Sequence, residues 1–302
     1  QAAQKPKSKK WNVAITFTNR AADEIASRLD DMGIDLLSIW TGTIHQFCMQ
    51  FIIRPYAMYS GRLSKGYTII DEYIKDEYGR SIAKGFGLNL NYFDDPFAYP
   101  VVVTAYEASL AANKEIDFDM ILRFSEELLN SCPFICSNIA SILSSVLVDE
   151  FQDTNELQYS ILAKIFKTSK SISVMFVGDI NQAIFGSLGG VAKSKAELDA
   201  LYETKFEEMS LTGCYRSTDR VVDLYRYFEV YETRVCSVAK IKDAVGAIKY
   251  CRSVSKENLT AEIAAIIRSE LAAGTPPEEI CVLAPRWQNL LKLSSDMRSQ
   301  LP

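Results

Sequence analysis

The sequence predicts an α/β protein built on a parallel sheet that is covered by helices on both faces. Three β-branched apolar runs, at positions 11–18, 145–150 and 173–179, each end in polar or acidic residues. Helical patterns follow the first run and separate the second from the third. Strands that alternate with helices pair in parallel, and the chemistry of such sheets gathers at the carboxyl ends of the strands.

The composition is that of a globular protein of about two domains. Of the 302 residues, 48% are hydrophobic and 24% are charged, which excludes disordered and low-complexity classes. No apolar run approaches the roughly 18 residues of a membrane span, and the first ten residues lack the apolar stretch of a secretory signal. We therefore expect a cytoplasmic protein without a membrane partner.

Charge and cysteine content exclude further classes. The net charge of −5 gives no global positive field for nucleic acid, although an enzyme can still hold nucleic acid in a local basic groove. Seven cysteines and one histidine, without a close Cys-x-x-Cys pair, argue against a zinc site and against a disulfide framework.

The first elements follow in order along the chain. The lysine-rich run KPKSKK (5–10) is interpreted as a solvated loop, and WNVAITFT (11–18) as a strand. Apolar residues at helical spacing then predict a helix that stops at Gly33. The segment 36–53 is interpreted as a strand to about Thr41 followed by a helix.

The middle of the chain differs in composition and in its hydrophobic pattern. Residues 54–140 contain many tyrosines, short helical patterns and no convincing buried strand, which predicts a mostly helical insertion. The strands at 145–150 and 173–179 follow, separated by the helical pattern ELQYSILAKIF. Beyond about residue 211, AIKYCRSV (247–254), the helical run 261–274 and ICVLAPR (280–286) predict a β-α-β start of a second α/β domain.

The sharpest constellation is the octet VDEFQDTN (148–155), which contains Asp149 and Glu150. An acidic pair that leaves a buried parallel strand suits nucleotide hydrolysis, since one carboxylate serves the water shell of Mg²⁺ and its neighbour polarises a water. The alternative is a helix N-cap with acids near the helix dipole. An isolated Asp-Glu pair favours that alternative, but the full octet favours hydrolysis.

The octet and its flanks, VLVDEFQDTNELQ (146–158), resemble motif II of the UvrD/Rep/PcrA group of superfamily 1 DNA helicases. Further segments resemble the other motifs in the family's order: AITFTNRAADEIASRL (14–29), TGTIHQFC (41–48), DFDMILRFSEELL (117–129), VGDINQAIFG (177–186) and LTGCYRST (211–218). The resemblance spans about residues 11–300.

The resemblance implies a fold and an activity. The fold is a RecA-like domain of the P-loop NTPase class at 1–49 and 141–212, a helical insertion at 50–140 and a partial second RecA-like domain at 213–302. The activity is ATP-dependent DNA helicase or translocase, with ATP and Mg²⁺. The substrate is single-stranded or partly duplex DNA, with 3′ to 5′ polarity, in repair, recombination or replication.

The resemblance also implies roles for individual residues. Asp149 holds Mg²⁺, and Glu150 orients and activates the attacking water. Gln182 senses the γ-phosphate, Arg216 reaches that phosphate from the second domain, and Tyr215 lies against the adenine. The residues implied to face single-stranded DNA are Thr18, Asn19, Thr43 and His45.

Two departures from the family pattern leave a second function open. The sequence contains no Gly-x-x-x-x-Gly-Lys-Ser/Thr motif, and the nearest run, GSLGGVAKS (186–194), lacks the glycine before its lysine. Ser187 and Leu188 stand where the family has an aromatic residue and an arginine. The resemblance thus implies a fragment without the phosphate cradle and the final motifs, inactive alone. The alternative is a helicase-like subunit that partners a nuclease or repair protein, in recombination or phage defence.

Overall fold

The computed structural model divides the chain into two compact units, residues 1–212 with 226–234, and residues 213–225 with 235–302. The described residues are 10–91, 94–184, 186, 189–246, 248–255, 258–285 and 287–298. Ser187, Leu188 and all of the KPKSKK run except Lys10 lie outside them.

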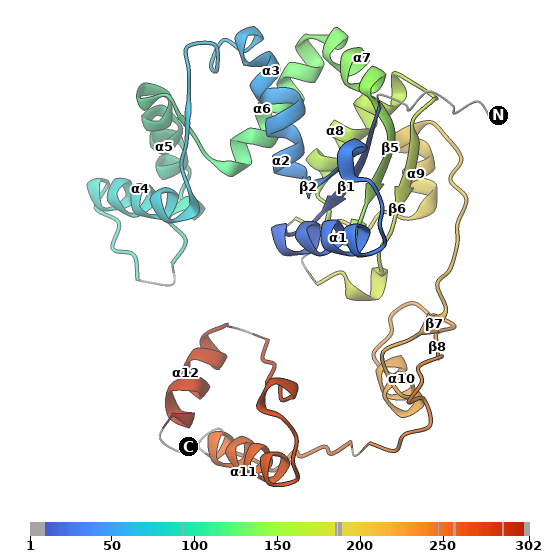
Figure 1. Cartoon of the computed structure of the whole chain (residues 1–302). Coiled ribbons are helices and arrows are strands. Elements are labelled where there is room, and N and C mark those ends of the chain that lie inside the picture. Colours follow the sequence, from blue (N-terminus) through green and yellow to red (C-terminus); the bar gives the residue numbers. More distant parts are fainter. Residues whose placement is uncertain are drawn as a thin grey trace, which may run out of the picture. The chain divides into compact units, whose positions relative to one another are not determined.

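A four-stranded parallel sheet forms the centre of the first unit (Figure 1). Its order is β2 (Ile39–Thr43), β1 (Trp11–Thr16), β5 (Leu143–Val148) and β6 (Ser173–Phe176). The predicted parallel sheet is thus confirmed. Ile15 lies opposite both Gly42 and Val148, and Val148 lies opposite Phe176, so the carboxyl ends of the strands are level.

The helices α1 (Asn19–Asp31) and α8 (Glu156–Lys167) connect neighbouring strands. The connection β1-α1-β2 and the connection β5-α8-β6 step in opposite directions along the sheet. Because such crossovers are right-handed, the two helices cover opposite faces. Thr18 starts α1 by accepting a hydrogen bond from the Ala21 N–H, so the chain turns into a helix directly after β1.

The segment between β2 and β5 is mostly helical, as predicted. Its longer helices are α4 (Glu72–Gly85), α5 (Pro100–Asn113), α6 (Phe118–Ser131) and α7 (Pro133–Ile142). After β2 the chain continues through α2 (Ile44–Phe47), a π-helix (Cys48–Ile53) and α3 (Arg54–Tyr56). The two-residue strands β3 (Thr68–Ile69) and β4 (Glu115–Ile116) pair in parallel.

One continuous apolar core joins the sheet to these helices. It includes the fully buried side chains of Phe47, Ile52, Ile139 and Tyr159. Tyr159 belongs to α8, and α8 packs against α6 and α7. The helix α9 (Lys195–Tyr202) closes the unit with the buried Tyr202. The carboxyl edge of the sheet is therefore held by a core that reaches well beyond it.

The second unit contains shorter elements. They are β7 (Gly213–Cys214), β8 (Cys236–Ser237), α10 (Asp219–Arg226), α11 (Leu259–Ala272) and α12 (Trp287–Met297). The predicted helix at 261–274 is confirmed by α11. The predicted strands at 247–254 and 280–286 are wrong for the residues that the structure describes there, because a strand requires a hydrogen-bonded neighbour and neither run has one. Among the described helices, none is long and apolar enough to cross a membrane.

Candidate functional site

The acidic pair lies where β5 ends. The Asp149 N–H donates to the Ile15 carbonyl at 2.8 Å, and the Phe151 N–H donates to the Val177 carbonyl at 3.1 Å. Glu150 stands between these two bonds with a left-handed backbone, φ 51°. A non-glycine residue in this region costs about 1–3 kcal/mol and persists only where its surroundings over-determine it. The hydrogen bonds to both neighbouring strands supply that constraint.

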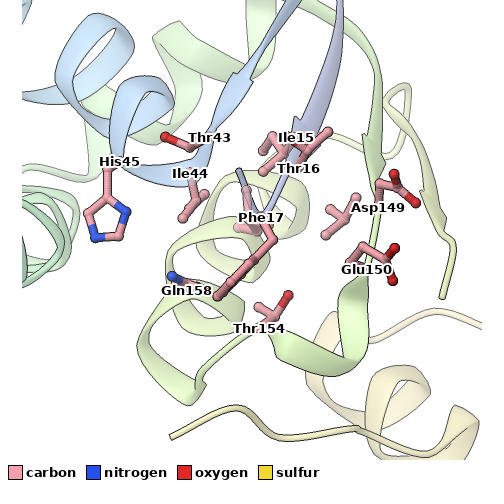
Figure 2. Close-up of a pocket in the computed structure, with 12 residues that line it drawn as sticks. Ile15, Thr16, Phe17, Thr43, Ile44, His45, Asp149, Glu150, Thr154 and Gln158 are labelled. Atoms are coloured by element: carbon pink, nitrogen blue, oxygen red, sulfur yellow. The ribbon is translucent and has the colours of Figure 1, made fainter. Parts of the chain in front are cut away.

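A pocket of about 50 Å³ opens beside the pair (Figure 2). Thr43 and His45 lie on one side of it, Asp149 and Glu150 lie on the other, and the Phe17 ring lies between the two groups. The remaining lining residues are Ile15, Thr16, Ile44, Val148, Thr154, Gln158 and Leu162. The structure therefore brings four of the predicted site residues to one pocket at the carboxyl edge of the sheet.

Negative charge is concentrated at this edge. Burial, reinforced by repulsion from Glu150, raises the pKa of the Asp149 carboxyl. The same two causes raise the pKa of Asp153. Lysine and arginine are absent from the described residues that line the pocket. Mg²⁺ prefers carboxylate oxygens and commonly takes one or two of them with water and phosphate, so Asp149 and its surroundings fit such an ion.

Gln152 connects the acidic pair to the end of β6. Its side chain is buried, with 2% exposed. Its Nε2 donates to Glu150 Oε2 at 2.7 Å, and its Oε1 accepts from the Asp179 N–H at 3.1 Å. Asp179 Oδ2 in turn accepts from Gln182 Nε2 at 2.8 Å. Gln182, which does not line the pocket, is thus joined to Glu150 through two intervening residues.

The hydroxyls of Thr18 and Thr43 share one arrangement. Thr18 Oγ1 accepts from the Ala21 N–H at 3.1 Å, and Thr43 Oγ1 accepts from the Gln46 N–H at 3.3 Å. Each hydroxyl is an acceptor in a helix cap, so its proton remains to be donated. Asn19 is exposed at the first position of α1. Thr18 lies two residues beyond the end of β1 and Thr43 is the last residue of β2, so both caps lie at the same edge of the sheet as the acidic pair.

His45 is partly buried, and its ring meets the Phe118 ring edge-on at 6.1 Å between centroids. Burial lowers the pKa of His45, and the charge of Asp119 opposes that shift. The imidazole is therefore neutral at pH 7. In that form it offers one donor and one acceptor, and no positive charge.

Tyr215 and Arg216 belong to the second unit and follow β7 directly. Both side chains are exposed, and Tyr215 is 83% exposed. Cys214, just before them, accepts hydrogen bonds from the backbone N–H groups of Ser217 and Arg216, which lower the pKa of its thiol. Tyr215 and Arg216 are therefore described within the second unit, and the pocket within the first.

Sequence reasoning did not single out Phe17, Thr154 and Gln158 as pocket residues, nor Gln152 as a link. All four stand inside the helicase-like motifs quoted above. Their presence in those motifs is the signal that could have raised them. Their contacts depend on the turn after β5, which the sequence does not reveal.

The family described as the UvrD/REP helicase N-terminal domain matches residues 4–86 and 91–202. The chain is similar to the ATP-dependent DNA helicase PcrA of Leuconostoc citreum, with 28% identity over 247 residues, 70% of this chain and 32% of the relative. It is 26% identical over 240 residues to PcrA of Staphylococcus epidermidis, with the same shares. It is 25% identical over 243 residues to PcrA of Staphylococcus aureus, which is 70% of this chain and 33% of the relative. The chain thus spans about a third of the length of these relatives.

Proposed function

The chain belongs to the UvrD/REP helicase family, and on that premise we propose that it serves an ATP-driven translocase or helicase that moves along single-stranded DNA. The observation that carries the proposal is the Asp149–Glu150 pair at the end of a buried parallel strand, flanked by the ends of β1 and β6. We also propose 3′ to 5′ polarity and work in DNA repair, recombination or replication, by family resemblance. The relatives' names give no support to the alternative of a nuclease partner.

Asp149 and Glu150 divide the hydrolytic work. Asp149 holds Mg²⁺ through its carboxylate, and its raised pKa reflects a charge that a cation would offset. When bound, the ion neutralises charge that develops on the phosphate oxygens. Glu150 orients the attacking water and accepts its proton. The left-handed backbone at Glu150 breaks the strand geometry directly after Asp149, and we propose that the two carboxylates serve different atoms.

The remaining nucleotide contacts come from three residues. Gln182 senses the γ-phosphate from the turn after β6, where Asp179 holds its amide. Arg216 stabilises the charge of the transferred phosphoryl group from the second unit, and Tyr215 stacks on the adenine. The side chains of Tyr215 and Arg216 are exposed and remain available to a ligand, which supports this proposal.

Single-stranded DNA runs past the amino-terminal ends of α1 and α2. Thr18 and Thr43 donate their hydroxyl protons to phosphate oxygens, and Asn19 and His45 donate N–H groups. A neutral His45 makes this contact a hydrogen bond rather than an ion pair. Contacts of this kind read the backbone and not the bases, so little sequence preference is expected.

DNA-stimulated ATP hydrolysis by the intact protein tests the proposal. Glu150→Gln keeps the size of the side chain but removes the base, so turnover should fall by ~10²- to 10⁴-fold while nucleotide affinity is kept. Glu107→Gln is the control, because Glu107 lies on α5 and pairs with Arg123. Near-normal turnover in Glu150→Gln would refute the assignment of the acidic pair.

A further inference from the structure

Gln152 is a buried polar side chain that the proposed mechanism does not use. Both ends of its amide are satisfied, one by the Glu150 carboxylate and one by the Asp179 N–H. A carboxylate only accepts and a backbone N–H only donates, so this pair of partners permits a single orientation of the amide. The side chain is therefore fixed between the ends of β5 and β6.

The neighbouring backbone is shaped around this amide. A Cβ at Gly178 would collide with Gln152 Oε1 and lie 2.7 Å from the Phe151 ring, so a larger residue before Asp179 would displace the Gln152 amide. The αL turn at Glu150 brings the carboxylate back toward Gln152, two residues further on. Of the two Glu150 oxygens, Oε2 is engaged by Gln152, and Oε1 has no hydrogen-bond partner within the described part of the chain.

We propose that Gln152 is a positioning residue, which aims the free oxygen of Glu150 and ties Glu150 to the turn that carries Gln182. The inference rests on the proposed function, since it assigns a role in the same hydrolytic site. Asp179 completes the tie, because Oδ1 accepts from the Asn181 N–H at 2.9 Å and Oδ2 accepts from the Gln182 amide. Asp179 and Gln152 thus connect a displacement of Gln182 to Glu150.

Two variants separate the two ends of the amide. Gln152→Met keeps the length of the side chain but loses both hydrogen bonds. Gln152→Glu keeps an acceptor for the Asp179 N–H but replaces the donor that faces Glu150 with a second carboxylate. Ser145→Ala is the control, because it removes a 2.7 Å hydrogen bond from Ser145 Oγ to Asn12 that also joins neighbouring strands, on β5 but away from Glu150.

The first readout needs no nucleotide. Hydrogen–deuterium exchange at the Asp179 amide should become faster in Gln152→Met and stay as in the wild type in Gln152→Glu and Ser145→Ala. Unchanged exchange in Gln152→Met would overturn the proposed tie between the two strand ends.

The second readout is turnover in the intact protein. Both Gln152 variants should lose about 10- to 100-fold in kcat, the scale of a misplaced reacting group, with nucleotide affinity kept. A wild-type kcat in both variants would overturn the inference alone. A wild-type protein without DNA-stimulated hydrolysis would overturn the proposed function first.

Discussion

The acidic pair after β5 and the Tyr215–Arg216 pair after β7 both follow a strand directly, but the two strands differ in how firmly the surrounding structure holds them. β5 pairs with a strand on each side over most of its length, and its end continues into hydrogen bonds with both neighbours. β7 has two residues and pairs with one two-residue strand. The first pair is held in place by its own unit, whereas the second is only presented at a surface.

Burial explains this difference. The buried cluster of the first unit includes side chains from the two central strands, β1 and β5, and from α6, α7 and α8. In the described part of the second unit the buried side chains are Val222, Ser237, Ala239 and Ala264. Small and isolated buried residues supply little apolar area. We therefore expect Asp149 and Glu150 to act from fixed positions. We expect Tyr215 and Arg216 to act through side chains that extend to a ligand.

The largest effect is expected from a variant that would break this comparison. Arg216→Ala should lower DNA-stimulated turnover by ~10³-fold or more with little change in nucleotide affinity, because an arginine finger acts mainly on the transition state. Arg220→Ala is the matched control, an exposed arginine of the same unit on α10. Equal turnover in the two variants would show that the exposed Arg216 does not take part in catalysis.

The next effect concerns stability and would sharpen the comparison. Phe47 is fully buried and its ring lies 5.0 Å from the Phe51 ring, so Phe47→Ala should cost about 3–5 kcal/mol of unfolding free energy. Tyr250 in the second unit is 85% exposed, and Tyr250→Ala should change that free energy by less than about 0.5 kcal/mol. Urea unfolding measures both. Similar losses would mean that the second unit has a core of its own in solution.

The same contrast explains what the sequence could predict. Three strands of the first unit were predicted from β-branched runs that alternate with helices, and a fourth from the segment 36–53. The structure has all four, as β1, β5, β6 and β2. The runs at 247–254 and 280–286 carry a similar pattern but form no strand in the described residues, since pairing depends on a partner that local composition does not encode.

Within the site, residue types were easier to predict than contacts. Asp149, Glu150, Thr43 and His45 were expected at one edge because parallel strands end together, and one pocket gathers them. The link through Gln152 was not expected, because it requires the left-handed turn at Glu150. Glutamate has no preference for the left-handed conformation, so the residue type at position 150 did not predict the turn.

The smallest effect tests the neutral state of His45. His45 is the single histidine of the chain, so an NMR titration of imidazole protons reports this residue alone. Burial outweighs the charge of Asp119, so the pKa should lie below the ordinary 6.5. Asp119→Asn should lower that pKa further, because it removes the opposing charge. Because burial lowers the pKa of His45 in the folded protein, the unfolded chain binds this proton at a higher pH. The free energy of unfolding should therefore fall as the pH drops below about 6.5.

The same titration tests the proposed DNA path. If DNA phosphate lies beside His45, a saturating oligo-dT should raise the pKa of His45, and DNA affinity should rise on acidification by the same linkage. A free-protein pKa above 6.5 would contradict the burial argument, and a pKa unmoved by oligo-dT would remove His45 from the proposed DNA path.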